Sequence, residues 1–390
     1  MAVSLPVYLD NHSTTMPDPR VVEAMLPYFT ERYGNAASRQ HEFGWVAEAA
    51  VELARKQVAR IIGATPSEII FTSGATESLN LAILGIAASL RHRGRHLITA
   101  VTEHRAVLDP VRYLEGDGFR VTRLPVDRFG LIDLDGLREA IRNETILVTI
   151  MSANNEIGTI APLQKIGEIC RGRGVLFHTD ATQAVSRIPL DVREGRIDLL
   201  SFSAHKMHGP KGVGALFCRA GQPPVAPSAQ ILGGGHERGF RSGTLNVPAI
   251  VGFGKAAELA IAEMEQSRTR VASLRDRLVH ELREDLDDLC VNGHPTERLD
   301  NNASITFPHA KADSVIMEMK DIAVSTGAAC SSATPEPSHV LQAIGLTKED
   351  AASTLRFGLS KFTTEGDIDY AIGRVVRSVK AVRARSMAIA

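Results

Sequence analysis

The chain has 390 residues, with 44 basic and 45 acidic side chains and a formal charge of -1 at pH 7. This balance gives no indication of the net basic charge typical of nucleic-acid-binding proteins and of proteins that bind anionic membranes. The 44% hydrophobic and 23% charged content is ordinary for a globular protein, and the length is enough for two domains.

The N-terminal residues lack the basic stretch and apolar core of a secretory signal, and the most apolar helical segment, 79–90, is too short to cross a bilayer. We therefore expect a cytoplasmic protein. The four cysteines are far apart, which argues against a structural zinc site and against a disulfide framework. Cys170, Cys218 and Cys290 adjoin apolar segments, and we expect all three to be small buried residues.

Short apolar runs alternate with segments of helical periodicity, which is the pattern of an α/β domain with a mainly parallel, buried sheet. In chain order we expect a strand at 8–9, helices at 17–29 and 43–62, strands at 68–72 and 96–102, a helix at 134–142, a strand at 145–151, a helix at 163–171, and strands at 175–179, 199–203 and 213–217. The helical pattern of 248–286 is longer than an ordinary domain helix, so we interpret it as a connector to a second, smaller domain. There we expect strands at 303–307 and 322–325 and helices at 312–319 and 366–383.

Four polar residues of different chemistry each follow one of these strands: His104, Asn155, Asp180 and Lys206. Ligands of parallel sheets bind outside the carboxyl ends of the strands, so these residues together predict a site. An amine placed where a buried strand opens into a loop is partly desolvated and can form a Schiff base with an aldehyde. The alternative is a surface loop in which Lys206 and Lys211 point at water.

A second candidate feature lies where the strand at 68–72 breaks at Gly74 and a helix follows with Thr76 in its first turn. Free amides at a helix N-terminus bind phosphate well, although a simply capped helix is the alternative. The glycine-rich segment 233–244, which contains two arginines, is either a mobile linker or an anion-binding loop.

Two later residues also carry chemistry. Cys330 lies among small residues only, which suits an accessible thiol, the alternative being an incidental cysteine in a turn. Arg356 lies in a strand-like segment where its charge needs a partner, either a substrate carboxylate held by two nitrogens or a structural ion pair.

Together these residues resemble the pyridoxal-phosphate-dependent cysteine desulfurases, which share the fold of the class V aminotransferases. The resemblance runs from Tyr8 to about residue 375 and rests on motifs at 72–78 (TSGATES), 102–104 (TEH), 154–158 (NNEIG), 180–183 (DATQ), 203–206 (SAHK), 233–239 (GGGHERG), 242–244 (SGT) and around Cys330. It implies a fold-type I enzyme whose large α/β domain, residues 16–262, contains a mainly parallel seven-stranded sheet. A smaller α+β domain, residues 1–15 and 263–390, would carry the Cys330 loop.

The resemblance implies pyridoxal 5'-phosphate as the cofactor. Lys206 would hold it covalently and then move the α-proton of the substrate, and Asp180 would pair with its pyridinium nitrogen. His104 would stack on the ring and assist acid–base steps, while Gln183 would hydrogen-bond the ring hydroxyl. The remaining cofactor-binding positions are Ala75, Thr76, Asn155, Ser203, His205 and, reaching in from the second subunit of a homodimer, Thr244.

The resemblance also implies the reaction. Cys330 would attack the sulfur of L-cysteine as a thiolate, leaving alanine and an enzyme persulfide for a sulfur-acceptor protein, either an iron–sulfur scaffold or a tRNA-thiolation carrier. Asn155, Arg356 and Asn11 would orient the substrate, and no metal, membrane or direct nucleic-acid partner is implied. The chain departs from the family pattern at His12 and Ala204. It also stops at Ala390, where relatives extend into a tail that helps to dock the iron–sulfur scaffold.

Other functions remain open. A selenocysteine lyase, or another β-eliminating or transaminating enzyme, would use the same cofactor, although transamination needs no thiol such as Cys330. A nucleotide-binding protein using residues 209–214 would need a Gly-x-Gly-x-x-Gly spacing after a first strand, which this segment lacks. A non-catalytic sulfur-carrier scaffold would bind no chromophore, whereas the set of cofactor-type residues favours an enzyme.

Overall fold

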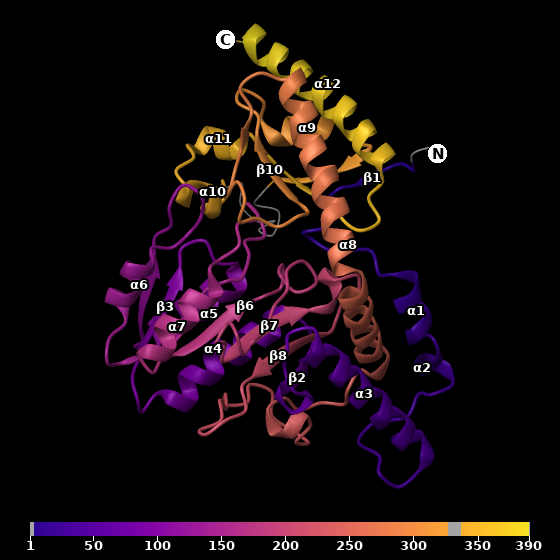
Figure 1. Ribbon diagram of the computed structural model, residues 1–390, viewed down its shortest axis with the longest axis vertical. Helices are drawn as coiled ribbons and strands as arrows, with labels where there is room; N and C mark the ends of the chain where they lie inside the picture. The colour runs from indigo at the N-terminus through magenta and orange to yellow at the C-terminus, as the bar shows by residue number, and fades with distance from the viewer. Residues whose placement is uncertain (1–3, 327–336, 390) are drawn as a thin grey trace.

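A computed structural model of the chain describes residues 4–326 and 337–389 (Figure 1). The helices are α1 (Pro19–Met25), α2 (Pro27–Thr30), α3 (Glu42–Arg60), α4 (Ala75–Leu90), α5 (Arg105–Gly116), α6 (Leu134–Ala140), α7 (Leu163–Gly172), α8 (Val247–Asp285), α9 (Ala312–Glu318), α10 (His339–Ala343), α11 (Lys348–Ala352) and α12 (Glu365–Ile389). The strands are β1 (Val7–Tyr8), β2 (Ile69–Thr72), β3 (His96–Ala100), β4 (Arg120–Leu124), β5 (Thr145–Thr149), β6 (Leu176–Asp180), β7 (Leu199–Ser203), β8 (Gly214–Cys218), β9 (Cys290–Val291), β10 (Asn302–Thr306), β11 (Ile322–Ala323), β12 (Ser325–Thr326) and β13 (Thr354–Gly358).

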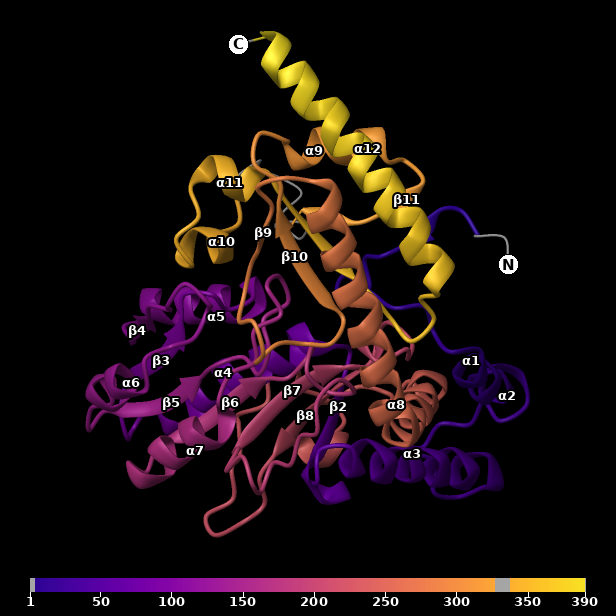
Figure 2. The same cartoon turned by 45° about the horizontal axis from the view of Figure 1, so that its top comes forward.

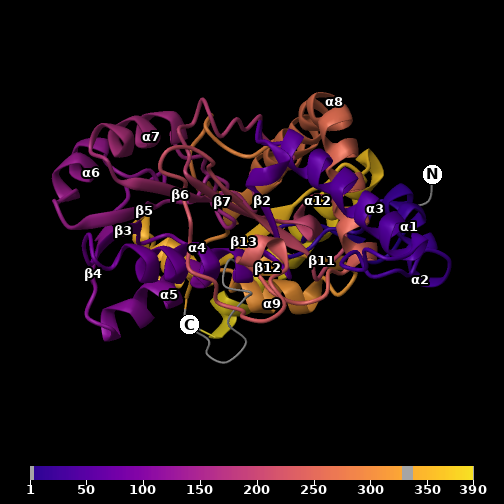
Figure 3. The same cartoon turned by 90° about the horizontal axis from the view of Figure 1, so that it is seen from below.

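The large domain is built on a seven-stranded sheet with the order β2-β8-β7-β6-β5-β3-β4. The pairs from β7 to β4 are parallel, and only β8 runs antiparallel to its neighbours. Helices α4 and α5 lie on one face of the sheet, and α6 and α7 lie on the other (Figure 3). The predicted α/β class and mainly parallel sheet are therefore confirmed.

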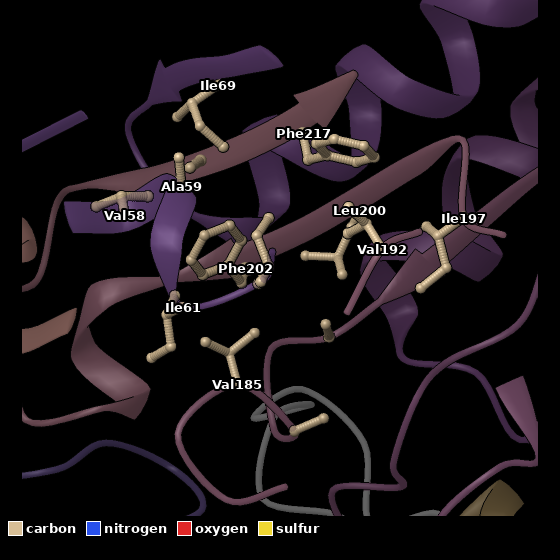
Figure 4. Packing of buried hydrophobic residues seen from close by; sticks show 14 of the residues in the cluster. Val58, Ala59, Ile61, Ile69, Val185, Val192, Ile197, Leu200, Phe202 and Phe217 are labelled. Carbon is tan, nitrogen blue, oxygen red and sulfur yellow. The ribbon is translucent and has the colours of Figure 1, made fainter. Parts of the chain in front are cut away.

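Both faces of this sheet are buried because its strands are apolar at successive positions rather than at alternate ones. In β7, Leu199 packs with the core under α4 and α5, whereas Leu200 and Phe202 pack into the core on the opposite face. Figure 4 shows Leu200 and Phe202 together with Val185 and Phe217 in that second core. A strand covered on both sides can carry apolar residues at adjacent positions, as Leu199 and Leu200 do, and the expected bounds 199–203 match β7.

Several expectations differ from the structure in detail. The helix expected at 17–29 divides into α1 and α2 at Leu26, because Pro27 cannot continue the backbone hydrogen bonding of the first helix. The edge strand β4 was missed because its residues are only partly buried and include two arginines. Cys290 is exposed rather than buried, since β9 is a two-residue strand at the edge of its sheet.

The small domain has its own sheets and its own core. The order β12-β13-β10-β9 forms an antiparallel sheet, and β1 pairs with β11 in parallel, which brings the N-terminal strand into this domain (Figure 1). The predicted strand at 322–325 is two short strands, β11 and β12, which belong to different sheets. Val7 and Leu9 pack with residues of β10, β13 and α12 in a second hydrophobic core. No helix in the described ranges is long and apolar enough to cross a membrane.

Helix α8 joins the two domains as one continuous element of 39 residues (Figure 2). Its first part, from Val247 to Leu259, contributes to the core of the large domain, and its later part, from Val271 to Leu282, contributes to that of the small domain. The side chain of Asn246 caps its N-terminus by accepting a hydrogen bond from the amide of Ala249 (3.2 Å). The predicted connector is thus confirmed, with bounds one residue earlier at each end.

The glycine-rich segment 233–244 is held against the large domain rather than being a free linker. Glu237 is buried, and its carboxylate pairs with both terminal nitrogens of Arg55 in α3, at 2.7 and 2.8 Å. The same carboxylate accepts the backbone amide of Phe71 in β2 (2.7 Å). The two arginines of the segment are also engaged: Arg238 donates to the carbonyl of Ile69, and Arg241 pairs with Glu77.

Candidate active site

The carboxyl ends of β3, β5, β6 and β7 border a cavity of ≈ 500 Å³. This is the edge of a parallel sheet where ligands bind. The four residues predicted from the strand ends, His104, Asn155, Asp180 and Lys206, all line it. Six more of the predicted residues line the same cavity: Ala75, Thr76, Gln183, Ser203, His205 and Arg356.

Lys206 lies at the end of a single 3-10 turn that directly follows the buried strand β7. The turn leaves the side chain half-buried at the cavity wall. Its ammonium group donates to the backbone carbonyl of Ser13 (2.7 Å) and to that of His12. Lys206 therefore does not point at water, whereas Lys211, which also lines the cavity, is exposed.

The N-terminus of α4 forms one end of the cavity. The residue before the helix, Gly74, has no side chain to cap it, so the first-turn amides of Ala75 and Thr76 are available to an anion. A Cβ built on Gly74 would meet only Ser203 Oγ, at 4.0 Å, so a side chain there would occupy this open corner. Amides, hydroxyls and the nearby Lys206 make a donor set that fits a phosphate group.

His205 adds a ring to the same corner. Its Nδ1 lies 3.2 Å from the hydroxyl of Thr14. Burial, together with the charges of Lys206 and Lys211, lowers the pKa of the His205 imidazole to about 4. The ring is therefore neutral at physiological pH and contributes a hydrogen bond rather than a charge.

Asp180 and His104 also line the cavity. Asp180, the last residue of β6, is 7% exposed, and its Oδ1 accepts the amide of Thr182 (2.9 Å). A carboxylate in this position suits a protonated ring nitrogen. His104 is the N-cap of α5, and its Nδ1 accepts the amide of Ala106 (3.1 Å), so the neutral ring carries its proton on Nε2.

Arg356 makes the structural ion pair that was one of the two alternatives left open by its sequence position. Its guanidinium pairs with Asp10 (3.0 Å), and it also donates to the carbonyl of Asn155 (2.9 Å) and to the hydroxyl of Ser13 (2.9 Å). The side chain is 3% exposed, yet it lines the cavity. Its Nε is buried without an acceptor among the described residues, and leaving such a nitrogen without a hydrogen-bond acceptor is costly.

Two of the predicted residues that the structure describes do not line the cavity. Asn11 is buried beside β13, where its amide donates to the carbonyl of Gly358 (2.8 Å), so the expectation that it contacts substrate has no support in its position. Thr244 is exposed and does not line the cavity of its own chain. Cys330 lies outside the described residues.

Comparison with known proteins identifies the family. A model of the class-V aminotransferases matches residues 7–371. The cysteine desulfurase IscS of Anaeromyxobacter sp. (strain Fw109-5) is 53% identical over 98% of this chain and 95% of its own length. The cysteine desulfurase of Homo sapiens is 50% identical over 98% of this chain and 83% of its own length.

The chain belongs to the cysteine desulfurase family.

Solved structures agree with this assignment. A protein titled NifS-like superposes with a TM-score of 0.89 at 38% sequence identity, covering 95% of this chain and 98% of its own. A structure titled SspA in complex with cysteine superposes with a TM-score of 0.80 at 35% identity, covering 92% of this chain and 100% of its own. The predicted family, fold and enzyme class are therefore confirmed.

The desulfurase cavity also contains residues that the sequence did not reveal as part of it. Thr14, Met151 and Lys211 line it, and so does His12, which the sequence showed only as a departure from the family pattern. For His12 and Thr14, the polar run 10–15 after the first strand was the available signal. That run leads from the small domain to the cavity, and no local periodicity indicates that its side chains reach the cavity.

Two buried carboxyl groups lie beside this desulfurase cavity. Burial raises the pKa of Glu103 well above its usual range, and one of its oxygens, Oε2, has no partner among the described residues. Burial also raises the pKa of Glu156 to about 7. The Glu156 carboxyl accepts a hydrogen bond from Ser338, which in turn caps α10 through the amides of Val340 and Leu341 (3.1 and 3.2 Å).

Proposed function

We propose that this chain uses pyridoxal 5'-phosphate to take sulfur from L-cysteine, leaving L-alanine and a persulfide on Cys330. The observation that best supports the proposal is the meeting of Lys206, Asp180 and the uncapped start of α4 in one cavity. They supply an amine, a carboxylate and backbone amides, which match an aldehyde, a ring nitrogen and a phosphate. The desulfurase names of the relatives support the same substrate.

Each group of the cofactor has a partner in this assignment. The amides of Ala75 and Thr76, with Ser203 and His205, would hold the phosphate, and Asp180 would keep the ring nitrogen protonated. His104 would cover the ring, and Gln183 would donate to the ring hydroxyl. When bound, the cofactor would supply an electron sink linked to the α-carbon of the substrate through its amino nitrogen. Lys206 would hold the cofactor through Nζ and would move the α-proton of the substrate.

The substrate is oriented by its carboxylate, which Arg356 and Asn155 hold. The Cys330 thiolate attacks the sulfur of the substrate, so that an S–S bond forms while the Cβ–S bond breaks. The electron pair of the broken bond stays with Cβ, which takes up a proton to give alanine. No external oxidant or reductant is needed, because the sulfur is transferred as a neutral atom from one thiol to another.

The test is peptide-mass analysis of the holoprotein after exposure to L-cysteine without reductant. We expect one added sulfur on the peptide that contains Cys330, with alanine formed. Cys330→Ser should abolish both, while Cys290→Ser, which changes an exposed cysteine of β9, should leave both intact. A yellow protein that forms no persulfide on Cys330 would refute desulfuration by this route.

The covalent link to the cofactor is tested separately. After borohydride reduction, we expect the cofactor mass on the peptide that contains Lys206. Lys211→Ala is the matched control, because Lys211 lines the same cavity and its loss should leave the cofactor mass attached to Lys206. A protein that binds no pyridoxal phosphate would overturn the whole assignment. Comparing initial rates on L-cysteine and L-selenocysteine separates a desulfurase from a selenocysteine lyase.

We further propose that residues 16–262 form the large domain and that residues 1–15 and 263–390 form the small one. The two separate hydrophobic cores support this division. We also propose a homodimer in which Thr244 contributes to the phosphate site of the other subunit. Its exposed position outside the cavity of its own chain supports that role. Thr244→Ala should then weaken cofactor binding. In a mixed dimer of one Thr244→Ala subunit and one Lys206→Ala subunit, the site that retains Lys206 should bind the cofactor normally, because the other subunit supplies its Thr244.

The sulfur acceptor is proposed from family resemblance alone, as an iron–sulfur scaffold or a tRNA-thiolation carrier. Incubation of the persulfide form with each class of acceptor, followed by mass analysis of both proteins, distinguishes them. The acceptor that gains one sulfur while the Cys330 peptide loses one is the partner.

A further inference from the structure

His12 is enclosed between the two domains at one end of the cavity. It is 2% exposed, and both of its ring nitrogens have partners. Nδ1 lies 3.0 Å from Gln183 Oε1, and Nε2 lies 3.2 Å from Asn302 Nδ2. Gly358 packs against the ring so closely that a Cβ added there would lie 2.8 Å from His12 Cδ2. The imidazole is therefore fixed in one orientation.

The donors and acceptors around this ring determine where its proton lies. Arg298 can only donate, and its Nη2 lies 3.4 Å from Asn302 Oδ1. The amide nitrogen of Asn302 donates to the carbonyl of Glu156 (3.1 Å). That nitrogen is a donor toward His12 as well, so Nε2 of the imidazole accepts and its proton is on Nδ1.

The other side of the ring leads to the same conclusion. Gln183 Nε2 donates to the backbone carbonyl of His12 (3.0 Å), which places Gln183 Oε1 opposite Nδ1. An amide oxygen is an acceptor, so Nδ1 donates to it. His12 thus holds Gln183 at both ends of its amide, once through the ring and once through the backbone. The second hydrogen of Gln183 Nε2 is available to an acceptor in the cavity.

The charged surroundings keep this arrangement constant. Burial, and then the positive charges of Arg356, Lys206 and Arg187, lower the pKa of the His12 imidazole to about 3. The ring therefore remains neutral over the pH range in which enzymes of this kind work. Its single proton stays on Nδ1, where Gln183 needs it.

We propose that His12 is a positioning residue that locks the Gln183 amide so that an N–H is presented to the ring oxygen of the cofactor. This inference rests on the proposed function, because it requires pyridoxal phosphate in the cavity. An N–H donated to that oxygen stabilises its anionic form. Weakening this hydrogen bond therefore raises the pH midpoint at which the bound cofactor loses a proton.

The experiment follows the visible absorption band of the holoprotein as a function of pH. In His12→Leu both ring nitrogens are lost, and we expect the titration midpoint to rise by about one pH unit, the shift produced by loss of one hydrogen bond to a charged group. His12→Asn places an amide near the position of Nδ1 and should restore the wild-type midpoint. His12→Gln places its amide near Nε2 instead, and should behave like His12→Leu.

Two further variants separate positioning from general damage. His96→Leu removes another buried histidine with two hydrogen bonds, to Thr122 and Thr145, outside the cavity, and should leave the midpoint unchanged. Gln183→Leu should raise the midpoint as His12→Leu does, and the double variant should raise it no further.

The results discriminate clearly. Midpoints of His12→Leu and His12→Gln equal to the wild type, with cofactor bound, would overturn the inference and leave the proposed function standing. A midpoint of His12→Asn shifted as far as that of His12→Leu would also overturn it, because the ring would then act through Asn302 rather than through Gln183. A wild-type protein that binds no cofactor would overturn the inference together with the proposed function.

Discussion

Replacing Glu156 by glutamine should change how the stability of the protein depends on pH. Its carboxyl has a pKa of about 7 in the folded state, against an ordinary value of 4.5, with burial as the main cause. A carboxyl with a raised pKa stabilises the folded state while it is protonated. Its contribution is complete below its unfolded pKa and is lost as the pH rises through 7.

The size of the effect follows from these two values. Between about pH 5 and about pH 8, the Glu156 contribution should fall by about 2–3 kcal/mol. Glu156→Gln cannot ionise and keeps a carbonyl that can accept the Ser338 hydroxyl. The free energy of unfolding of Glu156→Gln should therefore change less than that of the wild type over this rise in pH. Glu103, whose pKa is raised in the same direction, is present in both proteins and cancels in the difference.

The assay is the free energy of unfolding from urea titrations across this pH range, for wild type and variant in parallel. Glu168→Gln removes the same formal charge from an exposed position of α7, where Glu168 faces Arg196 at 3.7 Å, and serves as the control. It should follow the wild type at every pH. If the difference between wild type and Glu156→Gln is the same at both ends of the range, Glu156 is ionised throughout and the reasoning is refuted.

Three further predictions follow from contacts in the large domain and the cavity. Glu237→Gln leaves Arg55 facing an amide in a buried pair, so the free energy of unfolding should fall by about 3–5 kcal/mol, measured by urea titration. Arg356→Lys keeps the charge but loses the planar guanidinium that can hold a carboxylate through two N–H groups. KM for L-cysteine should therefore rise about tenfold or more in steady-state assays, with a smaller change in kcat. Gly214→Ala places a Cβ 2.6 Å from the carbonyl carbon of Gly74, so cofactor affinity in equilibrium titrations should fall about tenfold or more.

Each of these predictions has a matched control. Asp109→Asn breaks an exposed pair with Arg112 (3.4 Å) and should leave stability unchanged, in contrast to Glu237→Gln. Arg187→Lys alters a buried arginine that faces Asp300 and does not line the cavity, so KM should not rise. Gly172→Ala adds a Cβ that meets nothing within 4 Å and should leave cofactor affinity intact. Equal effects in variant and control would contradict the corresponding argument.

The sequence predicted the strand-end residues well for a geometric reason. Parallel strands point their carboxyl ends to one edge, so His104, Asn155, Asp180 and Lys206 had to approach one another once a parallel sheet was expected. For these four residues, the order of the strands in a parallel sheet was enough to place them at one edge. The residues at the start of α4 were assigned by the family motifs instead.

Other features depend on contacts that no local pattern records. Strand β1 has two residues, too few for an alternation that would show which way the following residues face, and so the sequence did not distinguish Asn11 from His12. The structure turns Asn11 toward Gly358 and His12 toward Gln183. Likewise, the glycine content of 233–244 left open a mobile linker or an anion-binding loop, and it did not show that the carboxylate of Glu237 pairs with Arg55 across a long sequence separation.

The helix α8 has a consequence for which changes of sequence the chain can tolerate. Between Leu259 and Val271 it contributes no fully buried side chain, so substitutions at the exposed positions of this stretch should be tolerated, whereas Ala260 and Ile261 pack against the core and Glu263 pairs with Lys361. A single inserted or deleted residue in the same stretch is different. It would turn everything beyond it by about 100° and shift it along the axis by about 1.5 Å. The small domain carries Arg356 to the cavity. The length of this stretch of α8, rather than its composition, therefore sets the alignment of the substrate site with the cofactor site.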